Sequence, residues 1–158
     1  MKIIGSEFDN FYLLGLKSYL KKYRVSDVEN FSDFFLKKIS QQNLLQTLTL
    51  SPRIIKGEEK IILLSSKKTL PLSVFLINQR EGVFLLNSGA LYGKNSDLRS
   101  VVSDKNNIIT SGEFNSLYES INVSRSCHAH FKTKGFYSQR LSALKKLGIS
   151  SLNDVFFS

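Results

Sequence analysis

Three side chains that commonly bind metals stand close together in the sequence: Cys127, His128 and His130. Cysteine and histidine are natural zinc ligands, but a structural zinc site needs about four of them in recognisable spacings. The order Cys-His-x-His matches no common zinc pattern, and the sequence has no second cluster to complete a set. Neighbouring residues on a helix do not face each other, which disfavours a Cys–His catalytic pair. We therefore expect a structural role for these residues, with no metal and no cofactor.

Two carboxylates, Glu7 and Asp9, follow the first apolar segment of the chain. General acid–base catalysis would require that such a pair lie in a pocket and have shifted pKa values. No nucleophile–base pattern and no phosphate-binding glycine loop accompanies them in the sequence. We therefore expect that the protein is not an enzyme.

Positive charge is the most pronounced compositional feature of the chain. Of 158 residues, 22 are Lys or Arg and 13 are Asp or Glu, so the formal net charge is +9. The charge is denser in residues 105–158, which carry 7 basic and 3 acidic side chains. A basic surface attracts polyanions such as nucleic acid, although a merely soluble basic surface explains the charge equally well. The pairs Lys37-Lys38 and Lys67-Lys68 are predicted to be solvated.

Composition also limits the class of protein. Hydrophobic residues make up 42% of the chain and are spread along it, which favours a folded core over disorder. No apolar run approaches the roughly 20 residues that a membrane-spanning helix needs, and the early acidic residues do not fit a secretory signal. A single cysteine, Cys127, excludes an internal disulfide and is typical of a reducing compartment. We expect a cytoplasmic protein with no membrane partner.

Residues 1–104 alternate strand-like and helix-like segments, which predicts a parallel sheet with flanking helices. Strands are expected at residues 2–5, 25–29, 44–50, 60–65 and 82–86. Helices are expected at residues 10–23, 32–40, 71–78 and 97–103. Pro52 is expected to end the third strand, because proline cannot donate a backbone hydrogen bond.

Residues 108–158 are predicted to be helical and to form a second domain after a polar boundary at residues 103–107. Thr110 or Ser111 is expected to cap a helix over residues 113–121. The clearest helix covers residues 136–147, with apolar residues on one side and Gly148 as its stop. A short last helix is expected at residues 151–157.

The C-terminal segment resembles the recognition helix and following turn of LuxR-type helix-turn-helix domains. Gln139-Arg140 stands where that family has a His-Arg pair, and Lys146-Leu147-Gly148-Ile149 is similar to its Lys-Leu-Gly-Val stop. Upstream, Ile109-Thr110-Ser111-Gly112-Glu113 resembles the family's Leu-Thr-x-x-Glu opening. Asn122-Val123-Ser124 resembles its Gly-Leu-Ser turn.

The first region is similar to the receiver domains that precede these DNA-binding domains. Residues 13–20 resemble the first receiver helix, and residues 82–88 resemble the fifth strand. A working receiver needs a carboxylate pair after its first strand to hold Mg²⁺ and a phospho-accepting Asp after its third. Here Phe8 stands in the pair, and residues 47–52 contain no carboxylate. The resemblance therefore implies a degenerate, shortened receiver that acts independently of phosphorylation.

The resemblance implies a DNA-binding transcriptional regulator with two parts. An α/β pseudo-receiver would occupy residues 1–104, and a small all-α helix-turn-helix domain would occupy residues 108–158. The recognition helix would enter the major groove of double-stranded DNA and contact bases and phosphates, as in the family. The residues implied for DNA binding are Lys134, Tyr137, Ser138, Gln139, Arg140, Leu141, Lys145 and Lys146. Of these, Lys145 and Lys146 would meet phosphate.

Three other interpretations stay open. In the first, the basic helix is an ordinary amphipathic helix with a solvated face. In the second, the chain is a truncated module that pairs with a full-length response regulator without binding DNA itself. The third and weakest is a small enzyme on an α/β fold, for which the sequence shows no catalytic constellation. The family reads paired half-sites, which predicts a homodimer or a heterodimer with another regulator. The apolar residues 155–157 are the expected contact, and closing the helical core is their alternative role.

Overall fold

The protein contains a five-stranded sheet. The computed structural model describes residues 2–3, 14–16, 18, 34–123 and 132–157. The strands lie side by side in the order in which they occur along the chain. Four of them run parallel, and the fifth turns back against the fourth. The strands are β1 (Lys2–Ile3), β2 (Phe35–Ile39), β3 (Ile61–Ser65), β4 (Val83–Asn87) and β5 (Ala90–Tyr92).

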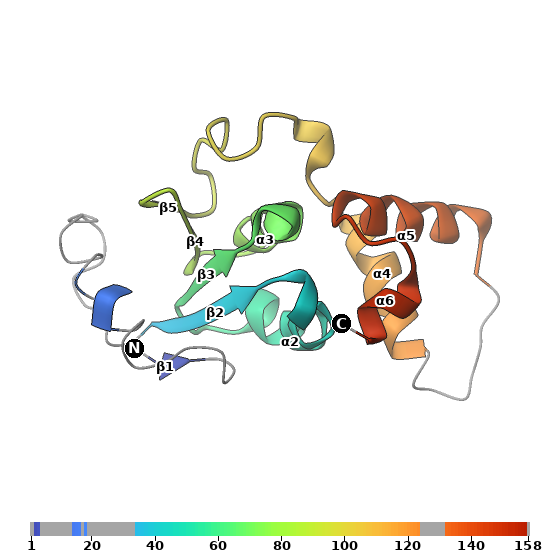
Figure 1. The fold of residues 1–158 in the computed structure, drawn as a ribbon, viewed down its shortest axis with the longest axis horizontal. Coiled ribbons are helices and arrows are strands. Elements are labelled where there is room, and N and C mark those ends of the chain that lie inside the picture. The colour runs from blue at the N-terminus through green and yellow to red at the C-terminus, as the bar shows by residue number, and fades with distance from the viewer. Residues whose placement is uncertain (1, 4–13, 17, 19–33, 124–131, 158) are drawn as a thin grey trace.

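Helices connect the parallel strands and then continue beyond the sheet. α2 (Leu44–Lys56) joins β2 to β3, and α3 (Leu70–Ile77) joins β3 to β4, because parallel neighbours need a crossover connection. Three helices of the later chain are α4 (Ser111–Val123), α5 (Lys134–Lys146) and α6 (Leu152–Phe156). These three lie together beyond the end of the sheet toward which the β2 and β3 arrows point (Figure 1).

One hydrophobic core joins a face of the sheet to all five of these helices. The sheet contributes Ile39, Ile61, Leu63, Val83 and Leu85 to it, and each of these side chains is fully buried. The later helices add Phe114, Leu117, Ile121, Ala143, Leu144 and Val155. The aromatic rings of Phe75 on α3 and Phe114 on α4 stack with their centroids 4.6 Å apart. The C-terminal helices therefore complete the core that the sheet and its crossover helices begin.

The shared core corrects the fold class predicted from the sequence. In the described residues, no separate all-α helix-turn-helix domain follows a receiver-like one, because the buried side chains of α4, α5 and α6 belong to the same hydrophobic core as those of α2 and α3. The strand order also differs, since a receiver sheet has the order 2-1-3-4-5 with its first strand inside. Here β1 lies at an edge and pairs with β2. The domain boundary at residue 104, next to the 3-10 helix η4 (Lys105–Asn107), stays a prediction.

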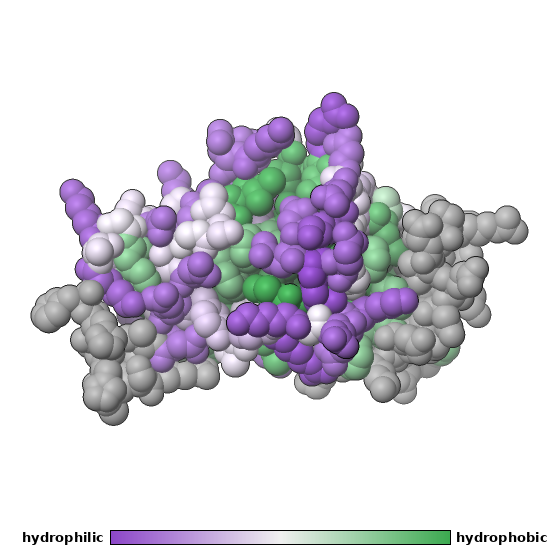
Figure 2. All heavy atoms as spheres, turned by 180° about the vertical axis from the view of Figure 1, so that it is seen from behind, coloured by the Kyte–Doolittle hydropathy of each residue, from purple (hydrophilic) through white to green (hydrophobic). Residues whose placement is uncertain are grey.

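The opposite face of the sheet carries a second, smaller cluster of buried side chains. Leu36 and Ile62 come from β2 and β3, while Phe34 and Leu16 pack beside them. The rings of Phe34 and Phe84 lie 5.9 Å apart. Both faces of the central strands are buried, which agrees with the continuous apolar run of residues 61–64 in β3, a pattern usual for parallel strands. Figure 2 shows the molecule from behind, with hydrophilic residues over most of the described surface and a smaller hydrophobic area near its centre.

The segment predicted as a third strand is instead the helix α2. Its buried residues are Leu44, Thr47, Leu48, Ser51 and Ile54, a spacing of three or four that suits a helix. Pro52 lies inside this helix rather than at its end. A proline at that position has no N–H to donate to the carbonyl of Leu48, and the Ser51 hydroxyl donates to that carbonyl instead, at 2.6 Å. The local sequence thus supplies the bond that its own proline removes.

The helix predicted at residues 32–40 is wrong as well, because residues 35–39 form strand β2. Lys37 was expected to be solvated, but its side chain is fully buried and its ammonium donates to Gln46 Oε1 at 2.9 Å. Residues 97–103 form turns rather than the predicted helix. The hairpin strand β5 was not predicted, although its two-residue turn, Ser88-Gly89, has the positive φ angles that hairpin turns require.

The remaining predicted elements are confirmed where the structure describes them. They are β1, β3, β4, α3, α4, α5 and α6, with small shifts at their ends. Most of the predicted helix at residues 10–23 and all of the predicted strand at residues 25–29 lie outside the described residues. Among the helices that are described, none has the length and apolar character needed to cross a lipid bilayer.

Candidate nucleic-acid interface

Helix α5 has clear local signals at both of its ends. Thr133 is the N-cap, and its hydroxyl accepts a hydrogen bond from the backbone N–H of Phe136 at 3.2 Å. At the other end Gly148 adopts a φ of +64°, and the N–H of Ile149 reaches back to the carbonyl of Leu144 at 2.9 Å. This is the glycine stop that the sequence predicts.

The inner face of α5 holds the helix on the rest of the molecule. Ala143, Leu144 and Leu147 are buried in the shared core, and Phe136 is half-buried. Lys132, just before the helix, bridges to Glu119 of α4 at 2.6 Å. The helix is therefore fixed on α4 through apolar contacts along its length and an ion pair near its start.

The outer face of α5 carries five of the eight residues implied for DNA binding. Lys134, Tyr137, Ser138, Leu141 and Lys145 are all exposed, and their spacing places them along one side of the helix. Among the large apolar side chains of this face, Tyr137 is 44% exposed and Leu141 is 59% exposed. The helix contains no acidic residue, so its outer face is positively charged at both ends.

Lys146 is placed differently from its neighbour Lys145. Its ammonium donates to Glu113 Oε2 at 2.8 Å and to the carbonyl of Ile108 at 2.9 Å, and its side chain is only 17% exposed. The structure therefore gives Lys146 a bond between α5 and α4, and its predicted contact with phosphate stays a prediction.

Glu113 is the carboxylate at the centre of this contact. It closes a capping box with Thr110, accepting from the Thr110 N–H at 2.8 Å, and it also accepts from the hydroxyl of Ser142. Burial alone would raise the pKa of the Glu113 carboxyl, but hydrogen bonds from Lys146 and Ser142 outweigh it and hold the pKa below its ordinary value. Glu113 is therefore ionised at neutral pH and pairs with Lys146.

Gln139 and Arg140 lie between the inner and outer faces. The side-chain oxygen of Gln139 accepts from the hydroxyl of Ser116 on α4 at 3.0 Å. The Arg140 guanidinium lies over the ring of Tyr137, 5.0 Å from its centroid, and reaches the Ser120 hydroxyl at 3.5 Å. Arg140 Nε is buried and has no hydrogen-bond partner among the described residues. Gln139 thus links α5 to α4, and Arg140 packs on the exposed ring of Tyr137. Both residues lie beside the outer face.

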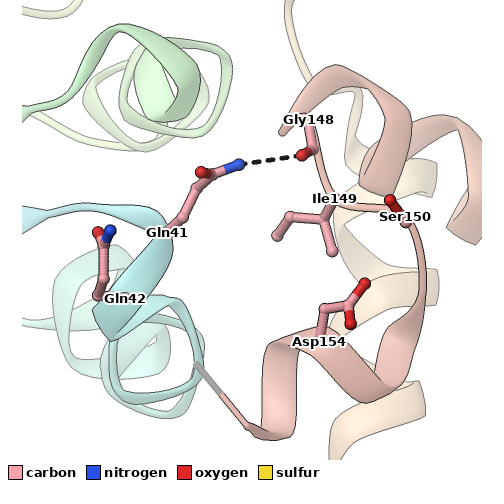
Figure 3. A pocket seen from close by; sticks show the side chains of 6 residues that line it. All are labelled: Gln41, Gln42, Gly148, Ile149, Ser150 and Asp154. Carbon is pink, nitrogen blue, oxygen red and sulfur yellow. Dashed lines mark hydrogen bonds between the residues drawn. The ribbon is translucent and has the colours of Figure 1, made fainter.

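The turn after α5 is held by a residue from the other half of the chain. The side-chain amide of Gln41, which follows β2, donates to the carbonyls of Leu147 and Gly148 at 2.8 and 3.0 Å. Figure 3 shows Gln41 pointing across a pocket toward Gly148, with Asp154 of α6 on the far wall. The pocket has a volume of about 280 Å³. The sequence offered no signal for this contact, because the two segments are about a hundred residues apart.

Other residues considered for chemistry give no site. Cys127, His128, His130, Glu7 and Asp9 lie outside the described residues. Within the described part of the chain, no three His, Cys, Asp or Glu side chains come together in a way that would hold a metal ion. Among the residues considered for function, those that the structure brings together on one exposed surface lie on the outer face of α5.

Comparisons of the chain with protein-family models, with curated proteins and with solved structures gave no match.

Proposed function

We propose that the protein binds double-stranded DNA through the outer face of α5 and regulates transcription, independently of phosphorylation. The observation that carries this proposal is the exposed, acid-free face formed by Lys134, Tyr137, Ser138, Leu141 and Lys145. Hydroxyl and apolar groups in its middle suit base edges and thymine methyl groups. Lysines at its ends suit phosphates, which fix position and supply salt-dependent affinity.

The dimensions of α5 agree with this use. Lys134 and Lys145 are eleven residues apart, which corresponds to about 16 Å along a helix axis. The major groove of B-DNA is about 12 Å wide and admits an α-helix. Two flexible lysines at the ends of such a helix would therefore reach the phosphates that border the groove, while Ser138 and Leu141 face the bases between them.

DNA binding also has consequences for the location of the protein and for its association with other chains. A protein acting on DNA in this way would work in the cytoplasm, and two copies, or one copy with another regulator, would read paired half-sites. We also propose that the chain has no enzymatic activity of its own.

The double variant Lys134→Ala/Lys145→Ala tests the proposal. Its affinity for labelled duplex DNA is measured by fluorescence anisotropy over a series of salt concentrations. The affinity falls as salt rises, and each lost phosphate contact reduces the magnitude of the slope of log affinity against log salt by about one. The double variant should therefore show a slope whose magnitude is smaller by about two. The matched control is Lys56→Ala/Lys94→Ala, which removes two exposed lysines outside α5. Equal binding by wild type and by the α5 variant would show that these two lysines of α5 do not contact DNA, and would contradict the proposal.

The exposed apolar residues favour one alternative function. Tyr137 and Leu141 would equally suit a protein partner, because solvent-exposed apolar patches often mark interfaces. In that case the chain pairs with a full-length response regulator and does not contact DNA. Wild type that binds no duplex alone, and joins a DNA complex only when such a regulator is added, would favour this interaction module.

A further inference from the structure

We propose that the DNA-contacting surface continues from the end of α5 onto the connection between β3 and α3, through Lys67 and Lys68. This inference rests on the proposed DNA binding by α5 and adds a second segment to the same interface. Both lysines belong to the 3-10 helix η3 (Lys67–Thr69), far from α5 in the sequence, and both side chains are exposed.

The turn at Gly148 brings these lysines next to the end of α5. The Gly148 N–H donates to the carbonyl of Lys145 at 3.0 Å, so this turn follows directly on the last exposed lysine of the helix. Lys68 lies against the same glycine: its Cδ is 3.6 Å and its Cγ 4.0 Å from the position that a Cβ on Gly148 would occupy. The Gln41 bonds described above hold the turn in this place (Figure 3).

The connection that carries Lys67 and Lys68 is itself held in place. The buried hydroxyl of Thr69 donates to the carbonyl of Ile39 at 2.9 Å, and the Ser66 N–H bonds the same carbonyl at 3.0 Å. The Ser73 hydroxyl donates to Ser65 Oγ at 2.8 Å. The backbone on each side of the lysines is therefore fixed to the sheet while their charged ends face solvent. Such a fixed backbone lowers the entropy lost when a partner binds.

The charges of the two segments also match a polyanion. Residues 61–80 and residues 132–153 contain no Asp or Glu. Asp154, which follows, uses its carboxylate to accept from the Ser151 N–H at the start of α6, across the pocket from Gln41. Lys67, Lys68 and Lys145 are all exposed, and Lys68 lies against the turn that directly follows Lys145, so positive charge from both halves of the chain flanks this turn. Regularly spaced phosphates on a duplex are the partner that such a surface fits.

The test compares three double variants on the full chain with a short fluorescein-labelled duplex of mixed sequence. Lys67→Ala/Lys68→Ala should reduce the magnitude of the slope of log affinity against log salt by about two. Lys67→Arg/Lys68→Arg should keep the wild-type slope, because arginine retains the charge. Lys56→Ala/Lys94→Ala is the control. Lys56 precedes β3 and Lys94 follows β5, so both lie at the end of the sheet opposite to Lys67 and Lys68. This control should bind as wild type does.

The outcomes separate this inference from the proposed function. If Lys134→Ala/Lys145→Ala weakens binding while Lys67→Ala/Lys68→Ala binds with the wild-type slope, the extension onto η3 is wrong and DNA binding by α5 stands. If the control loses as much slope as the Lys67/Lys68 variant, the effect reflects net charge and the extension is again wrong. If wild type does not bind the duplex at any salt concentration, both proposals fall.

Discussion

Glu113 and Lys146 show how a single ion pair assigns roles to neighbouring residues. Lys145 and Lys146 are equivalent by sequence, and both were predicted to meet phosphate. Adjacent residues point about 100° apart on a helix, so only one of them can face α4. Glu113 lies 33 residues earlier and selects Lys146. The exposed positions of the candidate site could thus be predicted from helical spacing, whereas the internal role of Lys146 depends on a contact between distant residues.

We expect Glu113→Gln to lower the free energy of unfolding at neutral pH by about 1.5–3 kcal/mol, a usual range for hydrogen bonds to charged groups. The folded pKa of Glu113 lies below its ordinary value of 4.5, so its contribution is fully present above pH 4.5 and is lost as the pH falls through the folded pKa. Urea unfolding of wild type and variant at a series of pH values measures the difference.

Glu119→Gln is the matched control for that prediction. Glu119 lies on the same helix as Glu113, and its substitution removes an exposed ion pair with Lys132. Exposed pairs contribute about 0–1 kcal/mol, so this variant should differ little from wild type. A Glu113→Gln variant that stays as stable as wild type at neutral pH would contradict the role given to the pair.

At the scale of elements, α2 shows how a helix accommodates an internal proline. Pro52 leaves the carbonyl of Leu48 without its helical N–H partner, and the buried Ser51 hydroxyl donates to it. We expect Ser51→Ala to lower the free energy of unfolding by about 1–3 kcal/mol, because a buried carbonyl loses its hydrogen bond.

The double variant Ser51→Ala/Pro52→Ala provides the decisive comparison. Alanine at position 52 restores an N–H to the carbonyl of Leu48, so the cost of Ser51→Ala should become much smaller in that background. Chemical denaturation of the four proteins in the cycle gives the coupling between the two residues. If Ser51→Ala costs the same with and without Pro52, the hydroxyl does not substitute for the missing bond.

The same helix explains why the sequence misled at two elements. The alternation of Leu with Thr47 and Thr49 favours a strand, but Thr47 is buried and Thr49 exposed, since the true period is that of a helix. In β2, two adjacent lysines suggest solvent, yet Lys37 is buried beneath α2 with Gln46 as a hydrogen-bond partner. Both errors arise because burial depends on which element packs against which, and a local pattern does not contain that information.

For the molecule as a whole, the sequence predicted a parallel sheet but not its strand order. Alternating strands and helices predict crossover connections, and these are present between β2, β3 and β4. The position of β1 at the edge depends on pairing with β2 across more than thirty residues. The expectation of a separate helical domain was wrong because the buried side chains of α4, α5 and α6 complete one core with those of α2 and α3.

The C-terminal residues lead to a prediction about association. Val155 is fully buried in the core, whereas Phe157 is 88% exposed, so only the second is placed to contact another copy. We expect wild type to dimerise through a surface that includes Phe157, and Phe157→Ser to shift sedimentation toward the monomer. At protein concentrations low enough for both to be monomeric, the two should unfold at the same midpoint. A wild type that sediments as a strict monomer, both free and on DNA, would contradict association.

During synthesis, α2 and α3 leave the ribosome well before α5 and α6 do. The apolar side chains that pack with Phe114 and Leu147 in the core are therefore exposed to solvent until those residues have been synthesised. The side-chain amide of Gln41 likewise has no Leu147 carbonyl to bind until the chain is 106 residues longer. A nascent or prematurely ended chain of this kind exposes the surface that chaperones and proteases recognise. Shortened products should consequently be removed rather than accumulate, so the cell would contain the protein either with its α5 surface in place or not at all.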